Sequence, residues 1–111
     1  MTKQLTKVTE EKIAHLQLIE QNLQGLISQR QNFQSQAAEI DNAMEELEKA
    51  GDEAYKIVGP LMVLSKKEDI KKDLLSRKEI IEMRIKNIEK QEKNLHEKGE
   101  KMRNEVMTEL K

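Results

Sequence analysis

Apolar residues recur in steps of three and four along the first half of the chain. Nine of the ten positions in this series are apolar: Leu16, Ile19, Leu23, Leu26, Arg30, Phe33, Ala37, Ile40, Met44 and Leu47. A sustained heptad spacing of this kind keeps one stripe of a helix facing a partner helix. Thr9 is the predicted N-cap and Gly51-Asp52 the predicted stop, so we expect a helix over about residues 9–50.

A second apolar series follows in the other half of the chain. Its regular row is wholly apolar: Leu74, Ile81, Ile88, Leu95 and Met102. Its companion row is less regular, because it contains Lys78, Glu92 and Gly99. The segment Ser65-Lys66-Lys67-Glu68 fits the capping-box pattern, in which a hydroxyl and a carboxylate bind N–H groups at a helix start. We therefore expect a second helix over about residues 66–110.

Two long helices with polar outer faces need a partner stripe to be stable in water. The simplest arrangement folds the chain back at its middle, so that the two seams pair in antiparallel fashion. This register predicts three neighbouring pairs of residues: Leu47 with Ile70, Phe33 with Ile85, and Leu16 with Met102.

Arg30 is the one charged residue in the first seam. The favoured interpretation packs its stem in the seam and leaves its guanidinium in water. The alternative is a pair with a carboxylate of the other helix that fixes the register.

Residues 54–65 separate the two helical series and are rich in β-branched residues. We expect two short strands, at residues 55–58 and 61–64, around a tight turn at Gly59-Pro60. Two alternating apolar sets are assigned, the first of Tyr55, Ile57, Leu61 and Val63, the second of Val58, Met62 and Leu64. A lone two-stranded hairpin is marginal in water, so we expect it to pair with strands of other chains.

Composition fits this mainly α fold, a long antiparallel coiled-coil helical hairpin with one short central β-hairpin in a single domain over residues 1–111. Charged residues make up 37% of the chain and aromatic residues 2%, which leaves little for a large core. Residues 1–53 hold five basic and ten acidic residues, whereas residues 54–103 hold fourteen and nine. Opposite charge on the two halves favours their pairing.

Acidic residues interrupt the basic ones and stacking aromatics are few, which disfavours an RNA-binding helical hairpin. We therefore expect no nucleic-acid partner.

The sequence contains no pattern that indicates catalysis. It has no cysteine, no glycine-rich phosphate loop, and only two histidines, His15 and His96, which we expect on the helix surface. We therefore expect neither an enzyme nor a metal or cofactor. No apolar run approaches the roughly 20 residues that span a bilayer, so we expect an intracellular protein without a membrane partner.

The two ends of the chain carry further apolar residues: Leu5, Val8 and Ile13 on one side, and Met102, Val106, Met107 and Leu110 on the other. Thr9 and Lys12 occupy the seam positions beyond Leu16, so we expect incomplete pairing of the helices there. Gly99 lies in the second seam, and we expect it to loosen this end; the alternative is a harmless drift of the seam on a long helix. Two interpretations stay open, an adaptable apolar binding surface and ordinary fraying with partial self-packing.

The central segment carries a family resemblance. Residues 55–63, YKIVGPLMV, follow Met44-Glu45-Glu46-Leu47-Glu48 and precede Lys66-Lys67. Together with the heptad helices on either side, they resemble the β-type subunit of prefoldin, most closely the archaeal kind. A single hairpin indicates the β type over the α type.

This resemblance implies a function that periodicity does not. Prefoldins of this kind are cytoplasmic hexamers of two α and four β subunits, whose hairpins form β-barrels. Their distal coiled-coil tips hold unfolded polypeptides and deliver them to a group II chaperonin without ATP. A structural coiled-coil scaffold or adaptor without client binding is the alternative.

The resemblance also assigns residues to three surfaces of this chain. The implied subunit interface comprises Tyr55, Ile57, Val58, Leu61, Met62 and Val63. The implied client-binding surface comprises Leu5, Val8, Ile13, Leu16, Met102, Val106, Met107 and Leu110. The implied chaperonin contact comprises Lys98, Lys101 and Arg103.

Overall fold

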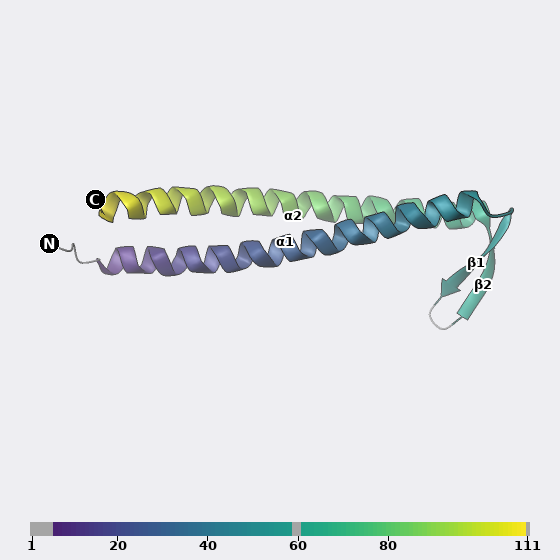
Figure 1. The fold of residues 1–111 in the computed structure, drawn as a ribbon, viewed down its shortest axis with the longest axis horizontal. Coiled ribbons are helices and arrows are strands. Elements are labelled where there is room, and N and C mark those ends of the chain that lie inside the picture. The colour runs from purple at the N-terminus through teal and green to yellow at the C-terminus, as the bar shows by residue number, and fades with distance from the viewer. Residues whose placement is uncertain (1–5, 59–60, 111) are drawn as a thin grey trace. The chain divides into compact units, whose positions relative to one another are not determined.

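The computed structural model describes residues 6–58 and 61–110 (Figure 1). Its elements follow in the order α1 (Lys7–Glu48), β1 (Glu53–Val58), β2 (Leu61–Lys66) and α2 (Lys67–Leu110). The predicted fold class, two long helices around one short antiparallel hairpin, is confirmed. None of the described helices is long and apolar enough to cross a membrane.

The chain divides into two compact units. The terminal unit comprises Met1–Arg30 with Asn87–Lys111, and the central unit comprises Gln31–Lys86. Each unit contains a segment of α1 and a segment of α2, and the central unit also contains both strands.

Helix α1 begins two residues earlier than predicted. The Thr6 hydroxyl accepts a hydrogen bond from the Thr9 N–H at 3.1 Å, and the Thr6 carbonyl accepts one from the Glu10 N–H at 3.0 Å. Thr6 is therefore the N-cap, and the assignment of that role to Thr9 is wrong. Thr9 lies inside the helix instead and is buried, with 1% of its surface exposed.

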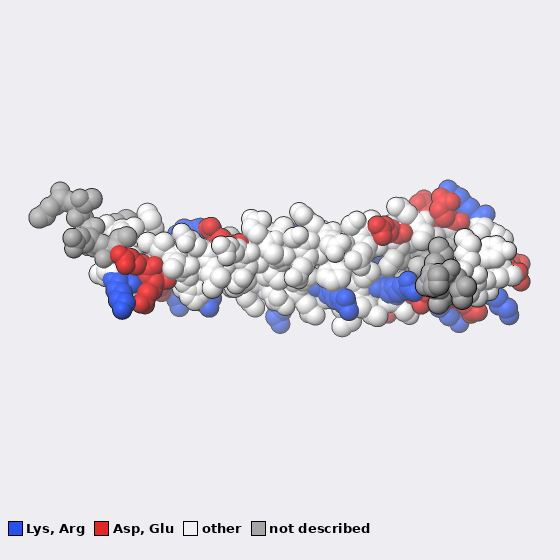
Figure 2. Space-filling view, turned by 90° about the horizontal axis from the view of Figure 1, so that it is seen from below, with Lys and Arg blue, Asp and Glu red and all other residues white. Residues whose placement is uncertain are grey.

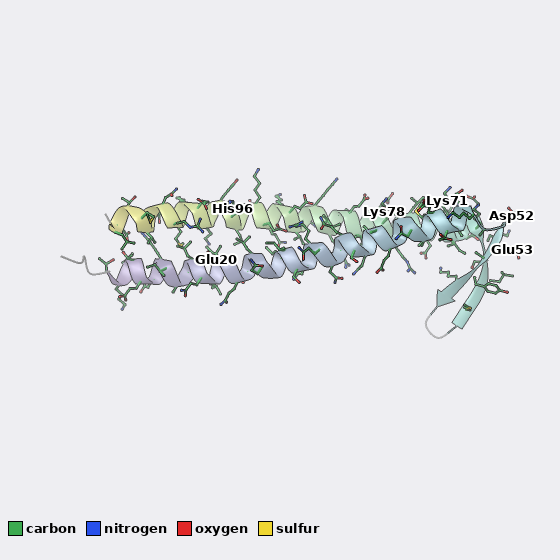
Figure 3. All side chains as sticks on the ribbon, in the orientation of Figure 1. Glu20, Asp52, Glu53, Lys71, Lys78 and His96 are labelled. Atoms are coloured by element: carbon green, nitrogen blue, oxygen red, sulfur yellow. The ribbon has the colours of Figure 1, made fainter. Side chains whose placement is uncertain are left out.

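The start of α2 also differs from the prediction. Strand β2 continues through Lys66, and Ser65 pairs with Ala54 across the sheet. Because the ladder extends to Lys66, the predicted capping box at Ser65 does not form the helix start. Helix α2 begins at Lys67, whose backbone N–H donates to the Asp52 carbonyl at 2.8 Å. Figure 3 shows Asp52 where the chain passes from α1 into β1.

In the central unit, the helices pair in the predicted register. Leu47 and Ile70 line one hollow between the helices and the hairpin. The Arg84 guanidinium lies 5.6 Å from the centre of the Phe33 ring. Arg84 is next in sequence to Ile85, the predicted neighbour of Phe33. Leu47 and Ile81 are buried in this seam.

In the terminal unit, the seam is buried at Ile19, Ile88 and Val106. Gly99 is buried as well, and a Cβ at this position would lie 3.5 Å from Cγ2 of Ile19. Gly99 therefore packs within the seam, and nothing in this contact supports the expected loosening.

The hairpin register corrects the predicted faces of the sheet. Val58 pairs with Leu61, Ile57 with Met62, and Tyr55 with Leu64. Directly paired residues share a face, and so do alternate residues of one strand, so Tyr55, Leu64 and Met62 lie together, while Val63 lies on the other face. The predicted sets wrongly grouped Val63 with Tyr55, and they wrongly separated the paired residues Val58 and Leu61, and Ile57 and Met62. The reason is that the observed register pairs odd-numbered residues with even-numbered ones. The predicted turn at Gly59-Pro60 lies outside the described residues.

Gly99 and Gly25 give a matched test of helix stability in the terminal unit. We expect Gly99→Ala to raise the free energy of unfolding by about 1 kcal/mol, because alanine has the higher helix propensity and its methyl group fits at ordinary contact distance. Gly25→Ala is the control, since nothing lies within 4 Å of an added Cβ there. Denaturant unfolding of each variant measures the effect, and a loss of stability at position 99 alone would contradict this packing.

Candidate functional site

The first candidate surface is an uncovered apolar face of the β-hairpin. Tyr55 is 68% exposed, Met62 68% and Leu64 53%, although all three share one face of the sheet. The described sheet has two strands, so each has an edge whose backbone groups have no partner strand. An apolar face combined with open edges is suited to the addition of strands from another chain.

The other face of the hairpin turns toward the helices. Lys56 Nζ lies 3.4 Å from Asp73 Oδ2 on α2. Ala54, Tyr55 and Lys56 line a hollow of about 540 Å³ together with Leu47 and Leu74. These contacts hold the hairpin against the helices, while Tyr55, Met62 and Leu64 stay more than half exposed. Val63 is 43% exposed on the helix-directed face, and the side chains of Ile57, Val58 and Leu61 are outside what the structure describes.

Ion pairs near the hairpin hold the two helices together. Glu48 at the end of α1 lies 3.1 Å from Lys71 Nζ and 3.9 Å from Lys67 Nζ. The hydrogen bond with Lys71 lowers the pKa of Glu48 below its ordinary value of 4.5 and raises the pKa of Lys71 above 10.5. Lys78 also pairs with Asp41 at 2.5 Å, and Figure 3 shows Lys71 and Lys78 along α2. These pKa shifts keep both Glu48 and Lys71 charged at neutral pH.

The second candidate surface lies at the helix ends of the terminal unit. Thr9 donates a short hydrogen bond to Glu109 Oε2, and Lys12 Nζ donates to Glu109 Oε1 at 2.7 Å. Lys12 also lies 3.5 Å from Glu105, and the Thr6 hydroxyl lies 2.8 Å from that of Thr9. We call these five residues the terminal cluster. Figure 2 shows acidic and basic side chains against each other at these helix ends.

The terminal cluster joins the helices through Thr9 and Lys12, at seam positions where incomplete pairing was expected. The pKa of Lys12 is raised above its ordinary value of 10.5, chiefly by the hydrogen bond to Glu109. The sequence did contain a signal for this cluster. Extending the Leu16–Met102 register by one heptad brings Thr9 opposite Glu109, so polar residues meet polar residues across the seam.

The residues expected to bind clients fall into two groups by exposure. Val8 is 56% exposed, Met107 53% and Leu110 43%. Val106 is buried, with 6% of its surface exposed, and three others are half-buried: Ile13, Leu16 and Met102. Leu5 lies outside the described residues. The surface available at these helix ends is therefore smaller than the sequence suggested.

The residues expected to contact a chaperonin are on the surface of α2. Lys98 and Lys101 are exposed. Arg103 is 51% exposed and pairs with Glu100 on its own helix and with Glu20 of α1 at 3.7 Å. Its charge is therefore shared with two carboxylates.

Arg30 forms the ion pair that sequence reasoning held as the alternative. Its Nε donates to Glu92 Oε1 at 2.7 Å, and the two side chains are only 26% and 19% exposed. The favoured interpretation, a guanidinium in water, is wrong because Glu92 of the facing seam provides a partner within reach.

The described residues contain no group of three or more His, Cys, Asp or Glu side chains that could hold a metal ion. His15 and His96 are both exposed, as expected. Neither candidate surface is a pocket with convergent polar groups. Both are apolar surfaces on a helical framework, which is typical of protein-binding modules.

Comparison with known proteins identifies the family. A family model described as prefoldin subunit matches residues 10–111. The chain belongs to the prefoldin subunit family. The prefoldin resemblance seen in residues 55–63 is thereby confirmed. Prefoldin subunits form hetero-oligomeric complexes with one another, and the family is one of co-chaperones.

Individual prefoldin relatives match most of the chain. A prefoldin subunit beta from Archaeoglobus fulgidus is 42% identical over 88 residues, which cover 78% of this chain and 76% of the relative. A prefoldin subunit beta from Methanospirillum hungatei JF-1 is 35% identical over 103 residues, which cover 91% of this chain and 86% of the relative. The crystal structure of the prefoldin beta subunit from Thermococcus strain KS-1 matches with a TM-score of 0.93 and 28% identity, covering 99% of this chain and 98% of that one.

The Arg30–Glu92 pair of this prefoldin chain allows a double-mutant test. We expect Arg30→Met and Glu92→Leu each to lower the free energy of unfolding by about 1–2 kcal/mol, because each leaves a partly buried charge without its partner. The double variant should recover much of that loss. Denaturant unfolding of all four proteins measures the coupling, and strictly additive losses would contradict a direct interaction.

Proposed function

We propose that this chain is a β-type subunit of a cytoplasmic prefoldin hexamer with two α and four β subunits, and that this hexamer is an ATP-independent holdase. It captures unfolded polypeptides at the helix ends and delivers them to a group II chaperonin. Membership of the prefoldin subunit family supports the general role. The exposed Lys98 and Lys101 are the proposed chaperonin contact.

The uncovered hairpin face is the observation on which the assembly part of the proposal depends. Three large side chains, Tyr55, Met62 and Leu64, are more than half exposed on one small sheet. A two-stranded sheet gains little stability alone, and these residues are covered once strands of other subunits extend the sheet and close it into a barrel. The α-type subunits and further copies of this chain are the proposed sources of those strands.

The helix ends suit client capture because their exposed apolar residues are few and diverse. Val8, Met107 and Leu110 offer a small surface with no fixed shape, and methionine adapts to different partners. A single contact of this size is weak. Several subunits on one assembly raise the effective concentration of such contacts, so that a client is held by avidity and still released.

Two exposed methionines give a matched test of the assembly surface. We expect Met62→Glu to dissociate the oligomer, because it places a charge in an apolar interface between strands. Met83→Glu is the control, since Met83 is 65% exposed against 68% for Met62 but lies on α2. Sedimentation or native mass measurement gives the size, and circular dichroism checks helix content. An intact oligomer with Met62→Glu would remove this face from the interface.

The client surface is tested by a triple substitution at the helix ends. We expect Val8→Ser, Met107→Ser and Leu110→Ser together to weaken protection of a denatured protein from aggregation several-fold, because they remove the exposed apolar surface there. The control replaces three similarly exposed residues of the central unit by serine: Leu75, Ile80 and Met83. Light scattering at fixed stoichiometry compares the two oligomers.

Equal protection by the helix-end and control variants would show that clients bind elsewhere. A native oligomer that never protects a client would favour the alternative function, a coiled-coil scaffold or adaptor. Failure of the Met62→Glu test would leave the client proposal standing, because the two tests probe different units of the chain.

A further inference from the structure

The seam between α1 and α2 changes character at the helix ends. Beyond Leu16, the α1 side of the seam continues with Lys12 and Thr9 in place of apolar residues. Thr9 is nonetheless the most deeply buried side chain among the described residues, with 1% exposed, and the Lys12 side chain is 25% exposed. The terminal cluster therefore closes the seam with hydrogen bonds and ion pairs.

A polar closure is easier to open than an apolar one. When the helices separate, hydrogen bonds to water replace the hydrogen bonds within the terminal cluster, so little free energy is lost. Its ion pairs are partly exposed, since Glu105 is 45% and Glu109 35% exposed, and salt weakens exposed pairs. The same positions filled with leucine would resist opening at any salt concentration.

Several apolar side chains are covered while the helix ends stay closed. Val106 is buried next to the terminal cluster, and Ile13, Leu16 and Met102 are half-buried behind it. Three apolar residues of the helix ends are exposed while the ends stay closed: Val8, Met107 and Leu110. Separation of the two helix ends would more than double the number of apolar side chains that face a client.

We propose that the terminal cluster is a closure that sets how much apolar surface these helix ends present to an unfolded polypeptide. Thr9, Lys12 and Glu109 are positioning residues in this account, because they act through the residues that they cover. Clients bind the open state better, so they shift the population toward it. This inference rests on the proposed client binding at the helix ends.

The opening test removes the central acceptor of the terminal cluster in the full-length assembled oligomer. We expect Glu109→Ala to speed amide hydrogen exchange over residues 102–110 by about five- to tenfold, as loss of a hydrogen-bonded contact does in local opening. It should also lower the oligomer concentration needed for half-maximal protection of a denatured protein. Glu97→Ala is the control, since Glu97 is an exposed glutamate on the same helix.

The closing test uses the absence of cysteine from the sequence. The variant Thr9→Cys with Glu109→Cys carries two thiols where the structure places two contacting side chains, and a cleavable bis-maleimide joins them. We expect cross-linking to reduce client protection several-fold and cleavage of the linker to restore it. Because one protein is compared with itself, folding of the variant is controlled.

The outcomes separate this inference from the proposed function. Faster exchange with unchanged protection in Glu109→Ala would overturn it, and so would equal protection before and after cross-linking. In either case client binding at the helix ends would stand, because it depends on the triple serine variant. Three results together support both this inference and the proposed function: weaker client protection in the triple serine variant, weaker protection after cross-linking, and stronger protection in Glu109→Ala.

Discussion

The apolar seam between α1 and α2 is the constraint on which the rest of the molecule depends. Helices with polar outer faces are marginal alone, and 37% of this chain is charged. Burial of residues such as Leu47 and Ile81 in the central unit, and Ile19 and Ile88 in the terminal unit, holds each pair of helix segments together. The antiparallel register then decides which residues meet: Lys71 reaches Glu48 beside the hairpin, and Lys12 reaches Glu109 at the helix ends.

Most of the apolar residues pack in the seam, so the large apolar side chains that remain exposed need a separate explanation. The chain has a mean hydropathy of −0.82, so exposed clusters of large apolar side chains are not a consequence of excess hydrophobicity. One such cluster lies on the hairpin around Met62, in contact with open strand edges, and favours permanent burial by other strands. A second lies at the helix ends around Met107, on helices whose backbone groups are already paired, and favours transient contact through side chains alone.

The sequence predicted what depends on periodicity and failed where single contacts decide. The heptads of Leu16–Leu47 gave the helices and their register, and the β-branched segment gave the hairpin. The faces of the hairpin were assigned wrongly because they depend on which of residues 55–58 lies opposite Met62, and that follows from strand pairing. Thr9 was assigned to a cap and Arg30 to water because their partners, Glu109 and Glu92, are about 100 and 62 residues away in the sequence. The register of the two helices predicts long-range side-chain partners only when it is applied to the polar positions of the seam as well as to the apolar ones.

Arg30–Glu92 and the terminal cluster are both polar interruptions of one seam, yet their places in the terminal unit give them different consequences. Arg30 and Glu92 are flanked along both helices by apolar positions, so separating them requires the neighbouring apolar layers to separate as well. Slipping by one heptad would leave both charges partly buried and without partners, and the pair therefore fixes register. Thr9 lies in the first turn of α1 and Glu109 in the last turn of α2, where separation disturbs only Val106 and the half-buried residues behind it. The same chemistry thus specifies the pairing inside the seam and makes it reversible at its end.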